Sequence, residues 1–250
     1  MKGVILAGGK GTRLAPMTFM INKHLLPVGR YPMIHHGVIK LRDAGIQEIL
    51  IIIGKQSAGL YAEYLGGGSR FGVRISMRIQ EEAGGIAQAL GLAEDFIPPG
   101  EKFTVLLGDN LFEDSLQPHT EAFLAQQDGA RVLVKKVPDP ERYGVPVFDG
   151  NRILRIDEKP DIPGSSYCVT GIYMYDRSVF DVIASTLPSK RGELEITDVN
   201  NHYAREGKLA YAELNGWWSD AGTFESLLNA SSKLISVVEP SNEPHDEELN

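Results

Sequence analysis

A glycine-rich segment near the start of the chain contains the residue types that bind polyphosphates. It supplies glycines, a hydroxyl group and two cations, at Gly8, Gly9, Gly11, Thr12, Arg13 and Lys23. Glycine allows positive φ and close backbone approach, so successive N–H groups can turn towards one anion. A guanidinium contacts phosphate oxygens in pairs, whereas an ammonium adds charge without a fixed geometry. The segment predicts a polyphosphate site, with a tight turn that carries incidental cations as the alternative.

Two common phosphate-binding motifs do not fit this segment. A P-loop places Ser or Thr directly after its Gly-Lys pair, but Lys10 is followed by Gly11. A dinucleotide-binding fingerprint requires a third glycine where this sequence has Leu14. The segment therefore predicts a different class of nucleotide site.

Two carboxylates are candidate ligands of a divalent cation. Asp109 closely follows the apolar run 103–107, and Asp220 lies in the segment WWSDAGT. A carboxylate at the carboxyl end of a strand is well placed to hold Mg²⁺, which commonly takes one or two protein carboxylates together with substrate phosphates. The alternatives are a turn at Asp109 and Asn110, and a helix N-cap at Asp220, a role that Thr223 can fill instead.

A second polar group follows the predicted strand 153–156. Glu158 and Lys159 precede Pro160, which restricts Lys159 to an extended conformation and so holds both charged side chains at a strand end. A carboxylate beside an ammonium suits a sugar phosphate, because sugar hydroxyls donate hydrogen bonds and the phosphate is anionic. In the segment PERYGV, Gly144 permits backbone contact with a ligand. The alternative is a solvated salt bridge between Glu158 and Lys159.

Other polar residues carry weaker signals. Gln80 offers an amide that can read a base edge, and Gly84 and Gly85 open a helix whose first N–H groups can face a base or a phosphate; helix packing is the alternative. The segment GELEITD at 192–198 is predicted to begin a helix. We expect structural roles for the histidines, which lack metal-ligand spacing, and for the cysteine and the tryptophans: His24, His35, His36, Cys168, Trp217 and Trp218.

Buried strands alternate with helices through the first half of the chain. Hydrophobic patterning predicts strands at 3–7, 48–53, 73–80 and 103–107, and helices at 32–44, 59–65, 85–94 and 121–127. This alternation predicts parallel pairing with right-handed crossovers, hence an open doubly wound sheet. Such sheets bind ligands beyond the carboxyl ends of their strands, where the glycine-rich segment and Asp109 both fall.

Closely spaced strands dominate the second half of the chain. Runs at 131–136, 145–148, 153–156 and 169–175, with a hairpin turn at 149–150, predict a smaller antiparallel region on the sugar side. Helices are predicted at 178–186, 196–206 and 223–235, and a strand at 209–214. We predict an α/β fold with a doubly wound, mixed but mostly parallel sheet. A single domain of residues 1–238 would combine a nucleotide-binding half (about 1–128) and a sugar-binding half (about 129–238), followed by an acidic, disordered tail at 239–250.

Composition argues against several classes of function. A net charge of −8 argues against nucleic acid or an anionic membrane as a partner, so an anion site must be a local basic pocket. The single cysteine rules out an internal disulfide framework and a thiolate metal cluster. No apolar run reaches transmembrane length, and the glycine-rich segment begins too early to leave room for a signal peptide, so we expect a cytoplasmic protein.

Ordered motifs along residues 1–235 resemble those of the sugar-phosphate nucleotidyltransferases. In chain order they are LAGGKGTRLAP, NKHLLPV, GGIAQAL, LLGDN, DPERYGV, EKP, YCVTGIY, RGELEITD and WWSDAGT. Within the family, the sequence most resembles the glucose-1-phosphate thymidylyltransferases, also called dTDP-glucose pyrophosphorylases, in a short form. The resemblance implies a Rossmann-like nucleotidyltransferase fold, Mg²⁺ as cofactor and a homo-oligomer.

The resemblance also implies roles for residues at the matching positions. The triphosphate would be bound by Gly8, Gly11, Thr12, Arg13, Lys23, Gln80, Gly85 and Asp109, with Gln80 and Gly85 at the thymine. Mg²⁺ would be bound by Asp109 and Asp220. Glucose 1-phosphate would be bound by Asn110, Gly144, Glu158, Lys159 and Val169. Catalytic roles would fall to Arg13, Lys23, Lys159 and Asp109.

These assignments predict thymidylyl transfer from dTTP to α-D-glucose 1-phosphate, giving dTDP-glucose and pyrophosphate. A sugar phosphate is already an anionic nucleophile, so catalysis requires charge neutralisation and in-line placement instead of a general base. A uridylyl- or cytidylyltransferase would share every phosphate ligand, whereas a non-catalytic nucleotide-sugar sensor should have lost Arg13, Lys23 or an Asp. The sequence departs from the family pattern at His24, where many relatives carry Gln, and at Pro146. The allosteric segment of longer relatives is not carried over.

Overall fold

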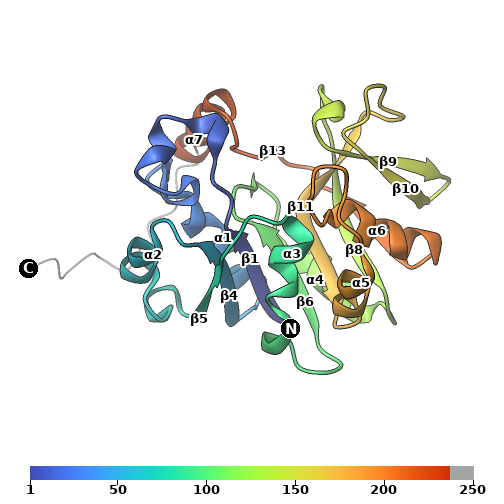
Figure 1. Cartoon of the computed structure of the whole chain (residues 1–250), viewed down its shortest axis with the longest axis horizontal. Helices are drawn as coiled ribbons and strands as arrows, with labels where there is room; N and C mark the ends of the chain where they lie inside the picture. The colour runs from blue at the N-terminus through green and yellow to red at the C-terminus, as the bar shows by residue number, and fades with distance from the viewer. Residues whose placement is uncertain (237–250) are drawn as a thin grey trace, which may run out of the picture.

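A seven-stranded sheet forms the centre of the computed structural model, which describes residues 1–236 (Figure 1). The strand order is β12-β8-β11-β6-β1-β4-β5. In chain order these strands are β1 (Lys2–Ala7), β4 (Glu48–Gly54), β5 (Arg74–Gln80), β6 (Lys102–Leu107), β8 (Ala130–Lys136), β11 (Tyr167–Asp176) and β12 (Leu209–Glu213). β11 runs antiparallel to both of its neighbours, and the other pairs in this sheet are parallel. The predicted mixed, mostly parallel sheet is confirmed.

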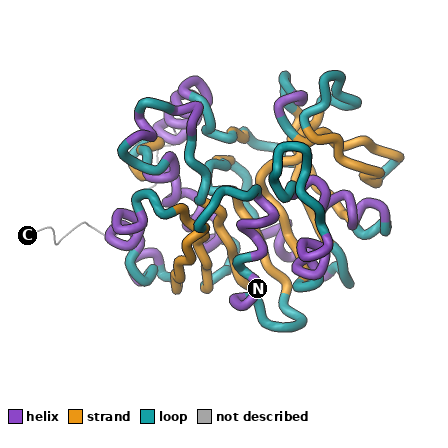
Figure 2. The backbone as a smooth tube through the Cα atoms, in the orientation of Figure 1, coloured by secondary structure: helices purple, strands orange, loops and turns teal. Residues whose placement is uncertain are grey.

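Helices cover both faces of this sheet, as Figure 2 shows by purple tubes on either side of the orange strands. On β1, Val4 and Leu6 belong to one buried cluster, whereas Ile5 and Ala7 belong to another. The first cluster includes residues of α3 (Ile86–Gly91), α5 (Val179–Ser185) and α6 (Ile196–Arg205), and the second includes residues of α1 (Met33–Asp43) and α2 (Ala58–Leu65). Because both faces are buried, central strands such as β4 read as continuous apolar runs.

Within residues 1–236, three two-stranded sheets lie outside the central one. They are β2 (Pro27–Val28) with β3 (Tyr31–Pro32), β7 (Leu111–Phe112) with β13 (Trp218–Ser219), and β9 (Gly144–Asp149) with β10 (Arg152–Glu158). The sequence predicted the β9–β10 hairpin and its turn. It did not predict the other two, because strands of two residues show no measurable alternation of apolar and polar side chains.

The antiparallel region of the second half is smaller than the sequence suggested. Of the four strands predicted for this region, β8 and β11 belong to the central sheet, and β9 and β10 form a separate hairpin. Two helices also differ from their predicted ranges by more than one residue. α4 (Gln117–Ala125) begins before residue 121, with proline in its first turn, where proline is favoured. α3 ends at Gly91 instead of residue 94, and a 3-10 turn (Glu94–Phe96) follows.

The last helix, α7 (Phe224–Ser236), packs against the loops that follow β1. Leu227 and Ala230 of α7 share a buried cluster with Leu14 and Leu26. Figure 1 shows α7, β13 and the β9–β10 hairpin on the side of the sheet towards which β1 runs. Within residues 1–236, no helix combines the length and the apolar character needed to cross a membrane. The predicted tail at 239–250 lies outside the described residues.

Candidate active site

The loop after β1 requires glycine at residue 11. Gly11 has a φ of +66°, in the left-handed region, and a Cβ there would lie 2.8 Å from Lys23 Cβ. Its carbonyl oxygen accepts hydrogen bonds from Leu14 N and from Thr18 Oγ1 at 2.9 Å each. These bonds close the loop on itself beside the Lys23 side chain.

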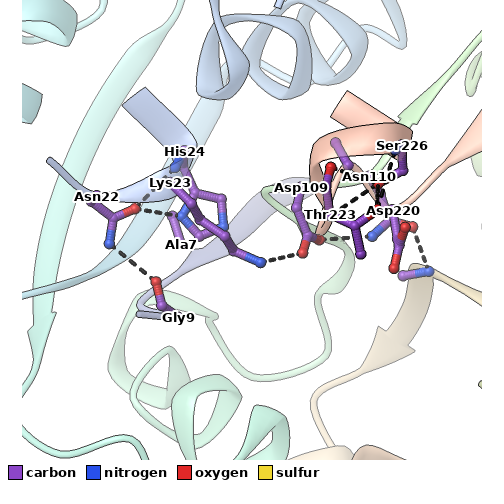
Figure 3. Close-up of polar contacts among 12 residues, drawn as sticks. Ala7, Gly9, Asn22, Lys23, His24, Asp109, Asn110, Asp220, Thr223 and Ser226 are labelled. Atoms are coloured by element: carbon purple, nitrogen blue, oxygen red, sulfur yellow. Dashed lines mark hydrogen bonds and ion pairs between the residues drawn. The ribbon is translucent and has the colours of Figure 1, made fainter. Parts of the chain in front are cut away.

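Asn22 is a buried residue that ties this loop to its surroundings (Figure 3). Its Nδ2 donates to Gly9 O at 3.2 Å, and its Oδ1 accepts from His24 N at 3.0 Å and from the Tyr61 hydroxyl at 2.8 Å. The bond from His24 N makes Asn22 the cap of the 3-10 turn that begins at Lys23. Since these bonds join the glycine loop, that turn and α2, they fix the backbone position of Lys23.

Lys23 forms a largely buried ion pair with Asp109, just beyond the carboxyl end of β6 (Figure 3). The side chains of Lys23 and Asp109 are 12% and 15% exposed. Burial acts to raise the pKa of the Asp109 carboxyl, but the Lys23 ammonium and hydrogen bonds from Lys23 and Asn110 hold that pKa below its usual value. Asp109 is therefore a carboxylate that stays charged although it is buried.

Asp220 reaches the same place through the pairing of β7 with β13. Ser219 pairs with Leu111, so the following residue, Asp220, comes opposite the end of β6. Thr223 Oγ1 accepts a hydrogen bond from Ser226 N at 3.2 Å, so Thr223 caps α7 and Asp220 does not. Burial and the Asp109 carboxylate raise the pKa of Asp220, against the opposing effects of Arg142 and Arg13. The two carboxylates thus repel each other across a shared site.

Arginine side chains flank Asp220. A Cβ on Gly222 would lie 2.9 Å from Arg13 Nη2 and 3.4 Å from Asp220 Oδ2, so Arg13 and Asp220 both lie close to that glycine. Arg142 Nη2 is 3.9 Å from Asp220 Oδ2, and Arg142 Nη1 pairs with Asp139 Oδ2 at 2.6 Å. The structure therefore brings Arg13 close to Asp220 and adds Arg142.

Asn110 is a buried connector in this structure. Its Oδ1 accepts from Gly171 N at 2.8 Å and from Trp218 Nε1 at 2.7 Å, and its Nδ2 donates to Asp109 Oδ1 at 3.0 Å. A Cβ at Gly171 would lie 2.5 Å from Asn110 Nδ2, so β11 can approach only because residue 171 is glycine. Asn110 thereby orients Asp109 and attaches β13 to the central sheet.

A second cluster of charges surrounds Glu158 at the end of β10. Thr197 Oγ1 donates to Glu158 Oε2 at 2.6 Å, and Arg191 Nη2 and Lys159 Nζ lie 3.5 and 3.3 Å from Glu158 Oε1. Gly144 pairs with Glu158 in the hairpin. The predicted neighbours Gly144, Glu158 and Lys159 are thus brought together, with a carboxylate and two cations at one strand end.

The predicted conformation of Lys159 is wrong. Its φ is +43°, in the left-handed region, instead of extended. The Lys159 N–H donates to Tyr143 O at 3.0 Å, which holds the backbone in this uncommon conformation. The proline after Lys159 disfavours the right-handed helical region, but it does not by itself select an extended backbone. Val169 lies half-buried on β11, opposite Val134 and just before a shift in strand register.

A cavity of about 740 Å³ opens on the other side of the glycine loop. Gly8, Thr12 and Gln80 line it, together with Lys10 and Lys55. Three residues predicted to bind nucleotide therefore face one space, at the carboxyl ends of β1, β4 and β5.

Gly85 is enclosed by backbone atoms. Its φ is +105°, and a Cβ there would overlap the carbonyl oxygen of Leu194. Ala87 N donates to Leu194 O at 3.1 Å and Leu194 N donates to Gly84 O at 2.8 Å, so the start of α3 is joined to the segment before α6. One N–H at the start of α3 is thus used for packing and does not face a ligand.

The histidines, the cysteine and the tryptophans are packed, as predicted. His24 is buried, with Nδ1 2.7 Å from Asn22 Oδ1. Burial and the Lys23 charge lower the pKa of His24 to about 3, so the ring is neutral. Cys168 is fully buried, and burial raises the pKa of its thiol to about 12. The Trp218 ring contacts Tyr143 edge-on, with centroids 5.4 Å apart.

The sequence did not single out four residues that the structure places in these clusters. They are Asn22, Arg142, Arg191 and Thr197. Arg142 and Arg191 lie in the quoted segments DPERYGV and RGELEITD, which offered a signal, but the second segment was interpreted only as the start of a helix. Asn22 and Thr197 also lie in quoted segments, NKHLLPV and RGELEITD, but their bonds to Gly9 and Glu158 form only when these segments pack against other parts of the chain.

The chain belongs to the nucleotidyl transferase family, whose description matches residues 2–237. It is also similar to proteins of this family that are named glucose-1-phosphate thymidylyltransferases. A glucose-1-phosphate thymidylyltransferase of Neisseria meningitidis is 42% identical over 95% of this chain and 83% of its own length. One of Xanthomonas campestris is 43% identical over 94% of this chain and 81% of its own length.

Solved structures show the same fold. A Bacillus anthracis protein assigned as a glucose-1-phosphate thymidylyltransferase, in complex with a sucrose, is 52% identical and superposes with a TM-score of 0.92 over 97% of this chain and 98% of that chain. UDP-glucose pyrophosphorylase complexed with UDP-glucose is 23% identical, with a TM-score of 0.82 over 94% of this chain and 98% of that chain. The second likeness shows the fold alone.

Proposed function

We propose that this protein transfers a thymidylyl group from dTTP to α-D-glucose 1-phosphate, forming dTDP-glucose and pyrophosphate. The observation that carries the proposal is the meeting of Lys23, Asp109, Asp220 and Arg13 at the carboxyl edge of the sheet. The names of relatives 42–43% identical to this chain support the choice of nucleotide and sugar. A cytoplasmic location and a homo-oligomeric state stay predictions.

In this reaction, a phosphate oxygen of the sugar phosphate attacks the α-phosphorus of dTTP. The bond from that phosphorus to the oxygen bridging to the β-phosphate breaks, and its electron pair leaves with pyrophosphate. No proton has to move, since the nucleophile is already an anion. The reaction thus requires fixed positive charges and in-line placement, which is what the candidate site offers.

We assign the triphosphate to the glycine loop and the cavity, with contacts from Gly8, Gly11, Thr12, Arg13, Lys23, Gln80 and Gly85. Arg13 stabilises the charge that develops on the leaving pyrophosphate, and Lys23 holds the α-phosphate. We assign the sugar phosphate to the Glu158 cluster and its neighbours, namely Asn110, Gly144, Glu158, Lys159 and Val169. Lys159 orients the incoming phosphate, and Arg191 adds a second cation beside Glu158.

We further propose that Asp109 and Asp220 hold Mg²⁺. The fit rests on their placement, because the pairing of Ser219 with Leu111 brings Asp220 beside the segment that carries Asp109. After burial, the Asp109 charge helps to raise the pKa of Asp220, and a cation between the two carboxylates would relieve that repulsion. Among residues 1–236, no group of three or more His, Cys, Asp or Glu side chains could hold a metal ion, so the proposed site has two protein carboxylates. Two carboxylates suit Mg²⁺, because they leave coordination positions for the phosphate oxygens of the substrates. Bound Mg²⁺ supplies positive charge that makes the α-phosphorus more electrophilic.

Pyrophosphate release tests the proposed function when it is measured for every pairing of dTTP, UTP and CTP with several hexose 1-phosphates. We expect the highest kcat/KM for dTTP with glucose 1-phosphate. The variant Arg13→Ala should lower kcat by about 10²–10³-fold with little change in the KM for glucose 1-phosphate. A preference for UTP or CTP would replace thymidylyl transfer with uridylyl or cytidylyl transfer. Binding of dTTP without pyrophosphate release from any pairing would identify a non-catalytic sensor.

A further inference from the structure

The amide of Gln80 is held between two neighbours at the wall of the nucleotide cavity. The Gln80 side chain is buried, and the residue lines the cavity at the end of β5. Its Nε2 donates to Gln88 Oε1 at 2.5 Å. Its Oε1 lies against Gly8, at the position that a Cβ of residue 8 would occupy. The nitrogen of this amide is thus directed at α3 and the oxygen at the glycine loop.

Gly8 favours this orientation of the Gln80 amide, and the packing around Gln88 holds its partner in place. A Cα–H group that faces a carbonyl oxygen makes a weak favourable contact, so Gly8 favours oxygen at this position over an N–H group. The Gln88 amide packs against Gly84. A Cβ on residue 84 would lie 3.0 Å from Gln88 Cδ, so the Gln88 side chain fits here because residue 84 is glycine. The bond from Ala87 N to Leu194 O fixes the first turn of α3, from which Gln88 projects.

We propose that Gln88 is a positioning residue that makes the site select a base with an N–H at ring position 3, thymine or uracil, over cytosine. This inference rests on the proposed function, which places the base at Gln80. Gln88 Oε1 takes one of the two Gln80 amino hydrogens and so holds that nitrogen against α3. We infer that the oxygen, turned towards the glycine loop, is the Gln80 atom nearer the base, and an amide oxygen only accepts hydrogen bonds. N3 of thymine or uracil carries a hydrogen and donates, whereas N3 of cytosine is an acceptor and would face the Gln80 oxygen unpaired.

The polarity of residue 88 therefore determines which group Gln80 offers. A glutamine carries both a donor and an acceptor, so the two amides can only reverse together. Glutamate at position 88 only accepts and fixes the present orientation. Lysine at position 88 only donates, which turns the Gln80 oxygen towards it and the Gln80 amino group towards the base, a polarity that suits cytosine.

The test compares the wild type with Gln88→Glu, Gln88→Lys and Gln88→Met by measuring Kd for dTTP and for dCTP with titration calorimetry. The readout is the ratio of the two affinities, because a charge at position 88 acts equally on both triphosphates and cancels. We expect the wild type and Gln88→Glu to prefer dTTP by similar factors. Gln88→Lys should lower the preference by roughly tenfold or more, and Gln88→Met should give an intermediate ratio.

An unchanged ratio in Gln88→Lys and Gln88→Met would overturn the proposal, as would a wild type that binds both triphosphates equally. Equal weakening of both affinities would show that Gln88 serves packing alone, which also overturns it. If Gln88→Lys does not fold, Gln88→Met decides the question, since methionine keeps the length of the side chain without its polar end. A wild type that prefers dTTP in binding but releases no pyrophosphate would contradict only the proposed function.

Discussion

Replacing Lys23 with methionine should destabilise the fold by leaving the Asp109 carboxylate buried without its partner. Breaking a buried ion pair costs about 3–5 kcal/mol. The residual exposure of 12% and 15% and the bond from Asn110 Nδ2 lower this expectation to about 2–3 kcal/mol. Methionine keeps most of the apolar stem beside Gly11, so a cavity adds little. The corresponding loss in Tm is roughly 4–12 °C.

Urea denaturation at neutral pH without added metal measures this loss, with Asp109→Asn and the double variant completing a mutant cycle. We expect the double variant to be more stable than Lys23→Met alone, because it no longer contains an unpaired buried carboxylate. A loss below about 0.5 kcal/mol in Lys23→Met, the size typical of an exposed pair, would refute the argument that burial governs this contact.

Three further sets of variants have defined expected outcomes. Gly85 has a φ of +105°, and an added Cβ would be crowded by Leu194, so Gly85→Ala should lower the unfolding free energy by about 2 kcal/mol or more. The control is Gly45→Ala, where φ is +80° and no atom lies within 4 Å of the added Cβ, and its expected loss is about 1 kcal/mol. Equal losses in urea denaturation would contradict the crowding argument. Glu158→Ala should raise the KM for glucose 1-phosphate by roughly tenfold and leave the KM for dTTP unchanged. Thr197→Val removes the 2.6 Å bond from Thr197 Oγ1 to Glu158 and should raise the same KM by a smaller factor. Steady-state kinetics in which both KM values rise alike would remove Glu158 from the sugar site. Burial lowers the pKa of His36 despite its contact with Val28 O, so the unfolded chain binds more protons and stability increases as pH rises through about 6.5. His36→Gln, measured by urea denaturation from about pH 5 to 7, should therefore show a shallower increase, and an unchanged slope would assign the effect to other groups.

The sequence was sufficient to predict the central strands because their apolar runs are a local property. The strand predicted at 48–53 corresponds to β4 (Glu48–Gly54), and the one at 103–107 to β6 (Lys102–Leu107). The place of β11 between β6 and β8 was not predictable in the same way. Strand order depends on packing between elements that are far apart in the sequence. The residue types of β11 alone do not distinguish a strand inside the central sheet from a strand of a separate hairpin.

The candidate site was predictable in its residue types but not in all of its contacts. Lys23 and Asp109 were both identified. The parallel pairing of β1 with β6 puts Asp109 beside the loop after β1, and the Asn22 hydrogen bonds place Lys23 within that loop, which the sequence does not show. The backbone of Lys159 was mispredicted, because Tyr143 O holds it through a contact between distant residues. Arg191 approaches Glu158 only when α6 packs beside β10, which the local sequence does not encode.

The bond from Trp218 to Asn110 joins positions 108 residues apart. A chain that is still emerging from the ribosome therefore contains the glycine loop, Lys23 and Asp109 well before it contains Asp220. During synthesis, such a chain already has one of the two proposed metal ligands while most of the second half is untranslated. If both carboxylates hold the proposed Mg²⁺, this site is complete only after β13 has been made and has paired with β7.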